Sequence, residues 1–250
     1  MMHQFNYKRI YHFIRRDLTI RKSSISTALI VISAILFVFF LINLREDYRI
    51  TSGEFTNLFG LFYIPAGVLF TFSICKESHD SKANHLYFVL PVSVYERMAA
   101  IWFTTTILYT AVFSVLSFVV GQFAIVTGGI LFGTDFHLLP MFSGEYLGFT
   151  MFYSIIQPVF LVGALAFKKN RIGKTLLVFV LVFFGVMIYN LILFTMLNYR
   201  YDVLPGNALA SEAFGLAQSD FSVFGMLFFL GILGPVMLFV AYCKMVEKEV

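Results

Sequence analysis

Six apolar runs, each 21 to 23 residues long and free of Asp, Glu, Lys, Arg and His, constrain this chain more than any other sequence feature. They cover residues 24–44, 55–75, 98–120, 146–167, 175–196 and 221–243. A helix needs about 20 mostly apolar residues to cross a bilayer, because lipid offers its backbone polar groups no hydrogen-bond partners. The sequence therefore predicts an all-α membrane protein with six transmembrane helices.

The composition leaves no room for a separate soluble domain. Of the 250 residues, 59% are hydrophobic and 13% are charged, whereas an ordinary soluble domain has about 25% charged residues. No charge-rich segment is present, so residues 1–250 are predicted to form a single transmembrane domain. The only two cysteines, Cys75 and Cys243, each end an apolar run, which favours free thiols over a disulfide framework.

The distribution of the 18 Lys and Arg residues predicts the orientation of the six spans. Six of them precede the first run, three follow the second, four follow the fourth and two follow the sixth, whereas the loops on the other face hold only three. Because basic residues are retained in cytoplasmic loops, we expect both termini to be cytoplasmic. This distribution explains the net charge of +4 without any nucleic-acid partner.

Two segments outside the runs also carry structural signals. Residues 5–20 place apolar side chains at helical spacing with basic residues mostly off that stripe, which predicts an amphipathic helix on the cytoplasmic leaflet. The alternative is a flexible basic tail that serves topology alone. Residues 125–145 are rich in glycine yet apolar, and we expect them to lie in the outer interface or to form a surface loop.

The polar side chains inside the spans argue against an ion-coupled carrier. Such a carrier needs carboxylate, His or basic groups within the membrane, and the six runs hold none. Gln157 and Asn190 are the candidates to line a substrate pathway, although hydrogen bonding between helices is the favoured interpretation. An apolar, Phe-rich interior slightly favours an amphiphilic substrate over a small ion.

Motifs for enzymatic chemistry are missing from the sequence. Gly173, Lys174 and Thr175 resemble the end of a phosphate-binding loop, but Lys168 occupies the position that requires the first glycine. The histidines of the 76–97 loop lack the spacing of helix-borne metal ligands, so solvated polar residues are favoured over a metal site. We expect this chain not to be an enzyme and to bind no metal or cofactor itself.

The longest strongly polar connection between runs, residues 76–97, carries a recognisable pattern. An acidic residue, Glu77, follows Lys76; the turn Leu90-Pro91-Val92-Ser93 comes later, and the charged pair Glu96-Arg97 precedes the third run. With the basic helix before six spans, this arrangement resembles the type-2 permeases of the ABC exporters. The chain departs from that family pattern at Ser78-His79-Asp80, where a glycine is common, and at Val94-Tyr95, where a basic residue is frequent.

The resemblance implies a function and partners. It implies a permease subunit in the bacterial cell membrane that pairs with a second permease chain and with a separate ATP-binding subunit, which would hold ATP and Mg²⁺. The loop would contain a coupling helix, and the residues implied in coupling are Glu77, Asp80, Pro91, Ser93, Glu96 and Arg97. Two other hypotheses stay open: a scaffold or assembly factor of an envelope complex that does not transport, and an ATP-independent secondary carrier, which the uncharged spans disfavour.

Overall fold

The computed structural model describes residues 6–47, 50–76, 92–134, 136–139, 141–167, 169–198 and 229–249. Within these ranges every regular element is a helix and no strand occurs, which confirms the predicted all-α class. In chain order the elements are α1 (Tyr7–Ile20), α2 (Lys22–Asp47), α3 (Ser52–Ile74), α5 (Val94–Phe103), the π-helix η2 (Thr104–Leu108), α6 (Tyr109–Phe132), α7 (Gly144–Ala166), α8 (Arg171–Asn198), the π-helix η5 (Phe229–Leu233) and α10 (Gly234–Glu249).

Four helices in the described ranges are long and apolar enough to cross a membrane. They are α2, α3, the continuous helix α5–η2–α6, and α7, and they correspond to the first four predicted spans, of which the second and the fourth each extend one residue past the helix end. The chain is thus a multi-pass membrane protein. The fifth apolar run lies on α8, which has 28 residues. Of the sixth run, residues 221–228 lie outside the described ranges, and the remainder is helical in η5 and α10.

The third predicted span lies on a helix much longer than the span itself. Helix α5–η2–α6 runs for 39 residues, Val94–Phe132, or about 58 Å at 1.5 Å per residue. Part of the 125–145 segment is therefore helical, because Gly128 and Gly129 continue the helix rather than ending it. The helix ends at Gly133, whose φ of 70° is readily adopted only by glycine.

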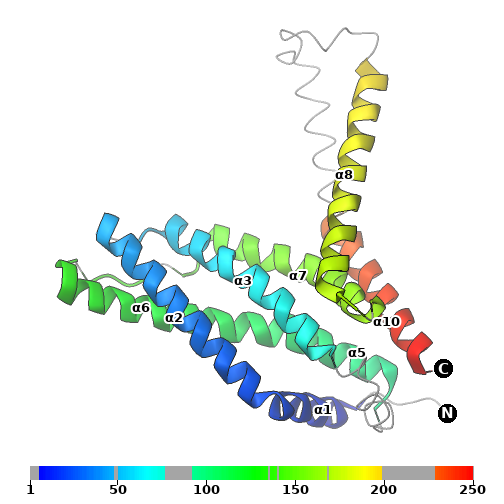
Figure 1. Cartoon of the computed structure of the whole chain (residues 1–250), viewed down its shortest axis with the longest axis horizontal. Helices are drawn as coiled ribbons and strands as arrows, with labels where there is room; N and C mark the ends of the chain where they lie inside the picture. The colour runs from blue at the N-terminus through cyan, green and yellow to red at the C-terminus, as the bar shows by residue number, and fades with distance from the viewer. Residues whose placement is uncertain are drawn as a thin grey trace.

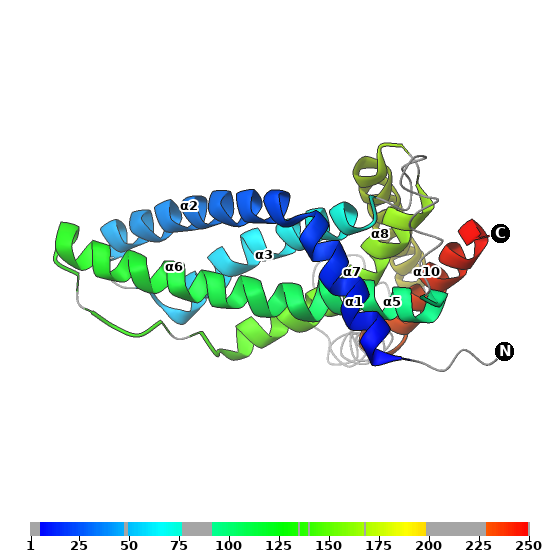
Figure 2. The same cartoon turned by 90° about the horizontal axis from the view of Figure 1, so that it is seen from below.

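The long helices lie lengthwise beside one another, and α8 departs from them. Helices α2, α3, α6 and α7 form this group, with α2 packed on α6 and α3 packed on α7 (Figures 1 and 2). Helix α1 crosses one end of the group and packs against α5. Helix α8 contacts α7 near its own start and then extends away at a steep angle (Figure 1).

Two apolar cores stabilise the two ends of the structure. One is aromatic and joins α2, α3, α6 and α7, where Phe59 packs against Tyr63, Phe113 and Tyr146. The other joins α1, α3, α5, α7 and α10, and it includes Phe13 of α1 and Met245 of α10. The second core gathers the start of α5, the end of α3 and helix α1 at one end of the molecule, where the predicted coupling loop begins and ends.

Candidate functional site

The described residues contain only part of the predicted site. Glu77, Asp80 and Pro91 lie outside the described ranges, as do the loop histidines that were considered as metal ligands. The side chain of Asn190 is likewise outside them. The structure does describe both ends of the loop, which are the end of α3 with the two residues that follow it, Cys75 and Lys76, and the start of α5 after Ser93. These ends form the candidate site.

Helix α5 begins at a reciprocal cap formed by two of the predicted residues. The Ser93 hydroxyl accepts a hydrogen bond from the backbone N–H of Glu96 at 3.3 Å. The Glu96 Oε2 atom accepts one from the backbone N–H of Ser93 at 2.9 Å. This capping box satisfies two N–H groups that a helix start otherwise leaves without partners. The sequence Ser93-x-x-Glu96 is its local signature, and it fixes where the loop becomes helix.

The same carboxylate also holds the start of α1, which is 90 residues away in sequence. Glu96 Oε1 accepts a hydrogen bond from the backbone N–H of Asn6 at 2.8 Å. Asn6 is itself the N-cap of α1, since its side chain accepts from the backbone N–H of Lys8 at 3.0 Å. A negative charge is favourable at a helix N-terminus. One buried carboxylate thus joins the starts of two helices, and the sequence analysis did not predict this contact.

The surroundings of Glu96 keep its carboxylate ionised. The residue lies before Met98, where the predicted third span begins, and therefore outside that span. Burial alone would raise the pKa of Glu96, but the N–H groups of Ser93 and Asn6, the Ser93 hydroxyl and the nearby Arg9 guanidinium together lower that pKa below its ordinary value. The charged form that makes both helix contacts is the favoured form at neutral pH.

Arg97 is enclosed by the protein rather than displayed on its surface. Among the described residues it is the largest fully buried side chain, and Glu96 beside it is only 1% exposed. The family resemblance implies a coupling role for both residues, together with those of the loop. Their positions suit side chains that hold the end of the loop in place, because neither presents a surface that a separate subunit could touch in this structure.

The other end of the loop is held by two arginines. Arg21, at the junction of α1 and α2, donates to the backbone carbonyl of Ser73 and, at 3.0 Å, to that of Ile74. Arg171, at the start of α8, donates to the carbonyl of Cys75 at 3.3 Å. The last carbonyls of a helix lack partners within the helix, and cationic side chains there are favourable. The end of α3 is therefore fixed by contacts from both α1 and α8.

Helix α1 connects the two ends of the loop. Its N-cap, Asn6, is bound at the start of α5, and Arg21, which follows its last residue, is bound at the end of α3. The 15 positions from Asn6 to Arg21 correspond to about 22 Å of helix. Phe13 faces inward and is buried, as an amphipathic helix predicts, and Asp17, one turn later, is buried as well. Figure 2 shows α1 lying across α5.

Inside the helix group, three polar residues of α7 and η2 form hydrogen bonds with one another. Gln157, which is fully buried, donates from Nε2 to the Thr105 hydroxyl at 2.6 Å. The Tyr153 hydroxyl donates to the backbone carbonyl of Thr105 at 3.0 Å. Thr105 lies in the π-helix η2, and π-helical turns occur frequently at functional sites. These bonds join α7 to η2. They correspond to the favoured interpretation of Gln157, which is hydrogen bonding between helices, and its role in lining a substrate pathway stays a prediction.

Thr175 of the Gly-Lys-Thr sequence takes part in helix packing. Its hydroxyl donates to the backbone carbonyl of Arg171 at 2.7 Å within α8. Its side chain lies against Gly163 of α7, and a Cβ atom added at Gly163 would lie only 2.1 to 2.8 Å from side-chain atoms of Thr175. Gly163 thus permits the close approach of α7 and α8.

Comparisons with known proteins give this chain no relatives: no family model, no curated protein and no solved structure matches it. The chain's own residues show two fixed helix ends, one held through Glu96 and the other through Arg21 and Arg171. In the sequence these two ends flank residues 77–91, which belong to the longest strongly polar connection between apolar runs.

Proposed function

We propose that the chain is the membrane-spanning permease subunit of an ATP-driven ABC exporter and acts with a separate ATP-binding subunit. In this proposal it has six transmembrane helices, both termini are cytoplasmic, and the cell membrane is bacterial. Two permease chains pair, and ATP and Mg²⁺ are bound by the partner subunits. The loop 76–97 forms the contact with them.

The observation that carries the proposal is the attachment of both loop ends to helix α1. A coupling loop transmits motion only if its ends move as one body with the helices that follow. Glu96 holds the start of α5 to α1, and Arg21 holds the end of α3 to the same helix. A push on the loop therefore moves α3 and the long α5–η2–α6 helix together instead of being absorbed by loose helix ends.

The predicted site residues then divide into two groups by position. Glu77, Asp80 and the turn at Pro91 supply the contact with the ATP-binding subunit. Ser93, Glu96 and Arg97 act from inside the chain and set the geometry of the contact. Binding of ATP to the partner biases a two-state arrangement of the spans, since it stabilises the state in which the partner presses on the loop.

Co-purification tests the proposal directly. A tagged chain is isolated in mild detergent and examined for an ATP-binding protein of roughly 25 to 35 kDa, the size of an ordinary ATPase domain or slightly more. We expect this protein to be present and to be lost after Glu77→Ala or Pro91→Ala. The matched control is Glu54→Ala, which removes the same type of residue from the far end of α3 and should retain the partner.

The scaffold hypothesis predicts a different outcome of the same experiment. The chain would then be isolated with envelope proteins that lack a nucleotide site, or would run alone, and substitutions in the loop would leave its partners unchanged. That result would remove the exporter proposal. Transport of substrate by vesicles that contain the chain and its ATPase is the complementary positive result, because a scaffold gives none.

A further inference from the structure

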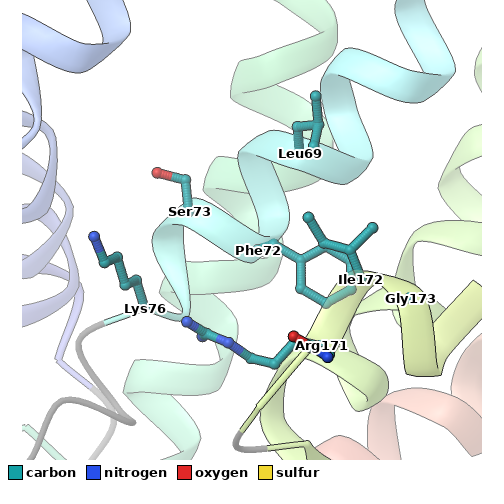
Figure 3. Close-up of a pocket in the computed structure, with 8 residues that line it drawn as sticks. Leu69, Phe72, Ser73, Lys76, Arg171, Ile172 and Gly173 are labelled. Carbon is teal, nitrogen blue, oxygen red and sulfur yellow. The ribbon is translucent and has the colours of Figure 1, made fainter.

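A pocket of about 620 Å³ lies between the last turns of α3 and the first turn of α8, close to the fixed end of the loop. Its walls are of two kinds. Leu69, Phe72 and Ile172 are apolar, whereas Lys76 and Arg171 are cationic. Figure 3 shows the apolar side chains along one part of the pocket and the two cationic ones towards the end of α3. The pocket therefore has an apolar part and a basic part.

The order of these parts along α3 corresponds to depth in a membrane. Leu69 precedes Lys76 by seven residues, or about 10 Å along a helix axis, and α3 is one of the helices apolar enough to span. The basic part thus lies at the end of a span and the apolar part lies further inside it. Leu69 is 56% exposed and Ile172 is 38% exposed, so the apolar wall is uncovered in this structure.

The charge of the pocket is uncompensated by the described part of the protein. Lys76 is exposed, and neither it nor Arg171 forms an ion pair with a described carboxylate. The described residues that line the pocket include no Asp or Glu. Arg171 uses Nη1 for the carbonyl of Cys75, and a guanidinium group has five N–H donors, so others remain for a ligand. Two cations next to an apolar wall complement a molecule with an anionic head and an apolar tail.

We propose that this pocket binds an anionic phospholipid, with the phosphate group at Lys76 and Arg171 and an acyl chain along Leu69 and Ile172. Basic pockets between transmembrane helices on the cytoplasmic side are suited to such headgroups. A free phosphate ion satisfies the two cations but leaves the apolar wall uncovered. The inference does not depend on the proposed exporter function. It adds a lipid contact at the place where α8 and α3 meet, next to the end of the loop.

Native mass spectrometry of the full chain in detergent tests this site, with phosphatidylglycerol and phosphatidylcholine as probes. We expect phosphatidylglycerol to bind more tightly, and Lys76→Gln/Arg171→Gln to weaken its binding by about tenfold or more, because each cation near an anionic lipid contributes appreciably. The matched control is Lys169→Gln/Lys174→Gln, which removes the same charge from neighbouring positions that do not line the pocket. It should bind almost as the unmodified chain does.

Three results would overturn the inference. The first is an equal loss of phosphatidylglycerol affinity in the pocket variant and in its control. The second is equal binding of the two lipids by the unmodified chain. The third is displacement of phosphatidylglycerol by an equal concentration of inorganic phosphate. If the double variant does not fold, because Arg171 also holds the carbonyl of Cys75, the exposed Lys76 is replaced alone. Lys76→Gln should then weaken phosphatidylglycerol binding by about threefold to tenfold, and an unchanged affinity would contradict the site.

Discussion

Replacing Glu96 by alanine should separate two helix starts at once. The carboxylate accepts hydrogen bonds from the backbone N–H of Asn6 at 2.8 Å and from that of Ser93 at 2.9 Å, and the residue is 1% exposed. Hydrogen bonds to a charged group contribute about 1.5 to 3 kcal/mol each when buried, and less where one side faces solvent, as at Asn6. We therefore expect Glu96→Ala to lower the free energy of unfolding by about 2 to 4 kcal/mol.

A matched variant at the start of another helix, α3, isolates the contribution of the contact between helices. Glu54 caps α3 through Thr51 in the same way, with Oε2 accepting from the Thr51 backbone N–H at 2.8 Å. It contacts no second helix start in the described structure. Glu54→Ala should therefore remove one cap only, at a cost of about 0.5 to 1 kcal/mol. The difference between the two variants measures the bond to Asn6 and the deeper burial of Glu96.

Thermal unfolding in detergent and hydrogen exchange provide the assay. For a chain of this size, 1 kcal/mol changes Tm by about 2 to 4 °C, so Glu96→Ala should lower Tm by roughly 4 to 16 °C and Glu54→Ala by at most about 4 °C. The amides of Asn6 and Ser93 should exchange faster only in Glu96→Ala. Equal Tm shifts in the two variants, or unchanged exchange at Asn6, would refute the reasoning.

Three further predictions concern pH and the helix ends. The pKa of Glu96 is lowered from 4.5 in the folded chain, so the ionised carboxylate stabilises the fold above that pH, and this stabilisation is lost as the pH falls through the folded pKa. The Tm difference between the unmodified chain and Glu96→Gln should therefore narrow below about pH 4.5. A difference that stays constant with pH would contradict this. Gly163→Ala should lower the free energy of unfolding by about 1 to 3 kcal/mol because the new Cβ atom meets the Thr175 side chain. In the control Gly148→Ala, the new Cβ atom has no neighbouring atom within 4 Å, so Tm should be unchanged or slightly raised. Arg21→Lys should lower the free energy of unfolding by about 1 to 2 kcal/mol, since lysine lacks the planar guanidinium that donates to two carbonyls at the end of α3. Amide hydrogen exchange at the end of α3 should become faster, and an unchanged exchange rate would argue against this prediction.

Local sequence rules predicted the helices but not all of their limits. The first four spans follow from apolar length alone, and the structure confirms four helices of that kind. The amphipathic pattern of residues 5–20 likewise corresponds to α1. The long α5–η2–α6 helix exceeded the predicted span, because part of the glycine-rich 125–145 segment, which was expected to lie in the outer interface or to form a surface loop, continues the helix. The helix ends only at Gly133, whose φ is positive.

The candidate site was less accessible to sequence reasoning, for a physical reason. The capping pair Ser93 and Glu96 is a local signature, since its residues are three positions apart. The bonds from Glu96 to Asn6, from Arg21 to Ile74 and from Arg171 to Cys75 join residues 90, 53 and 96 positions apart. No local pattern specifies such pairs, because they depend on how whole helices pack.

The measurement that tests the central proposal most directly is site-specific photo-crosslinking in intact cells. A photoreactive residue at position 80, in the predicted contact, is compared with one at position 142, where Phe142 is 85% exposed on the segment before α7. The proposal predicts an adduct with an ATP-binding protein from position 80 and none from position 142. An adduct from position 80 with proteins that lack a nucleotide site, or no adduct there at all, would contradict it.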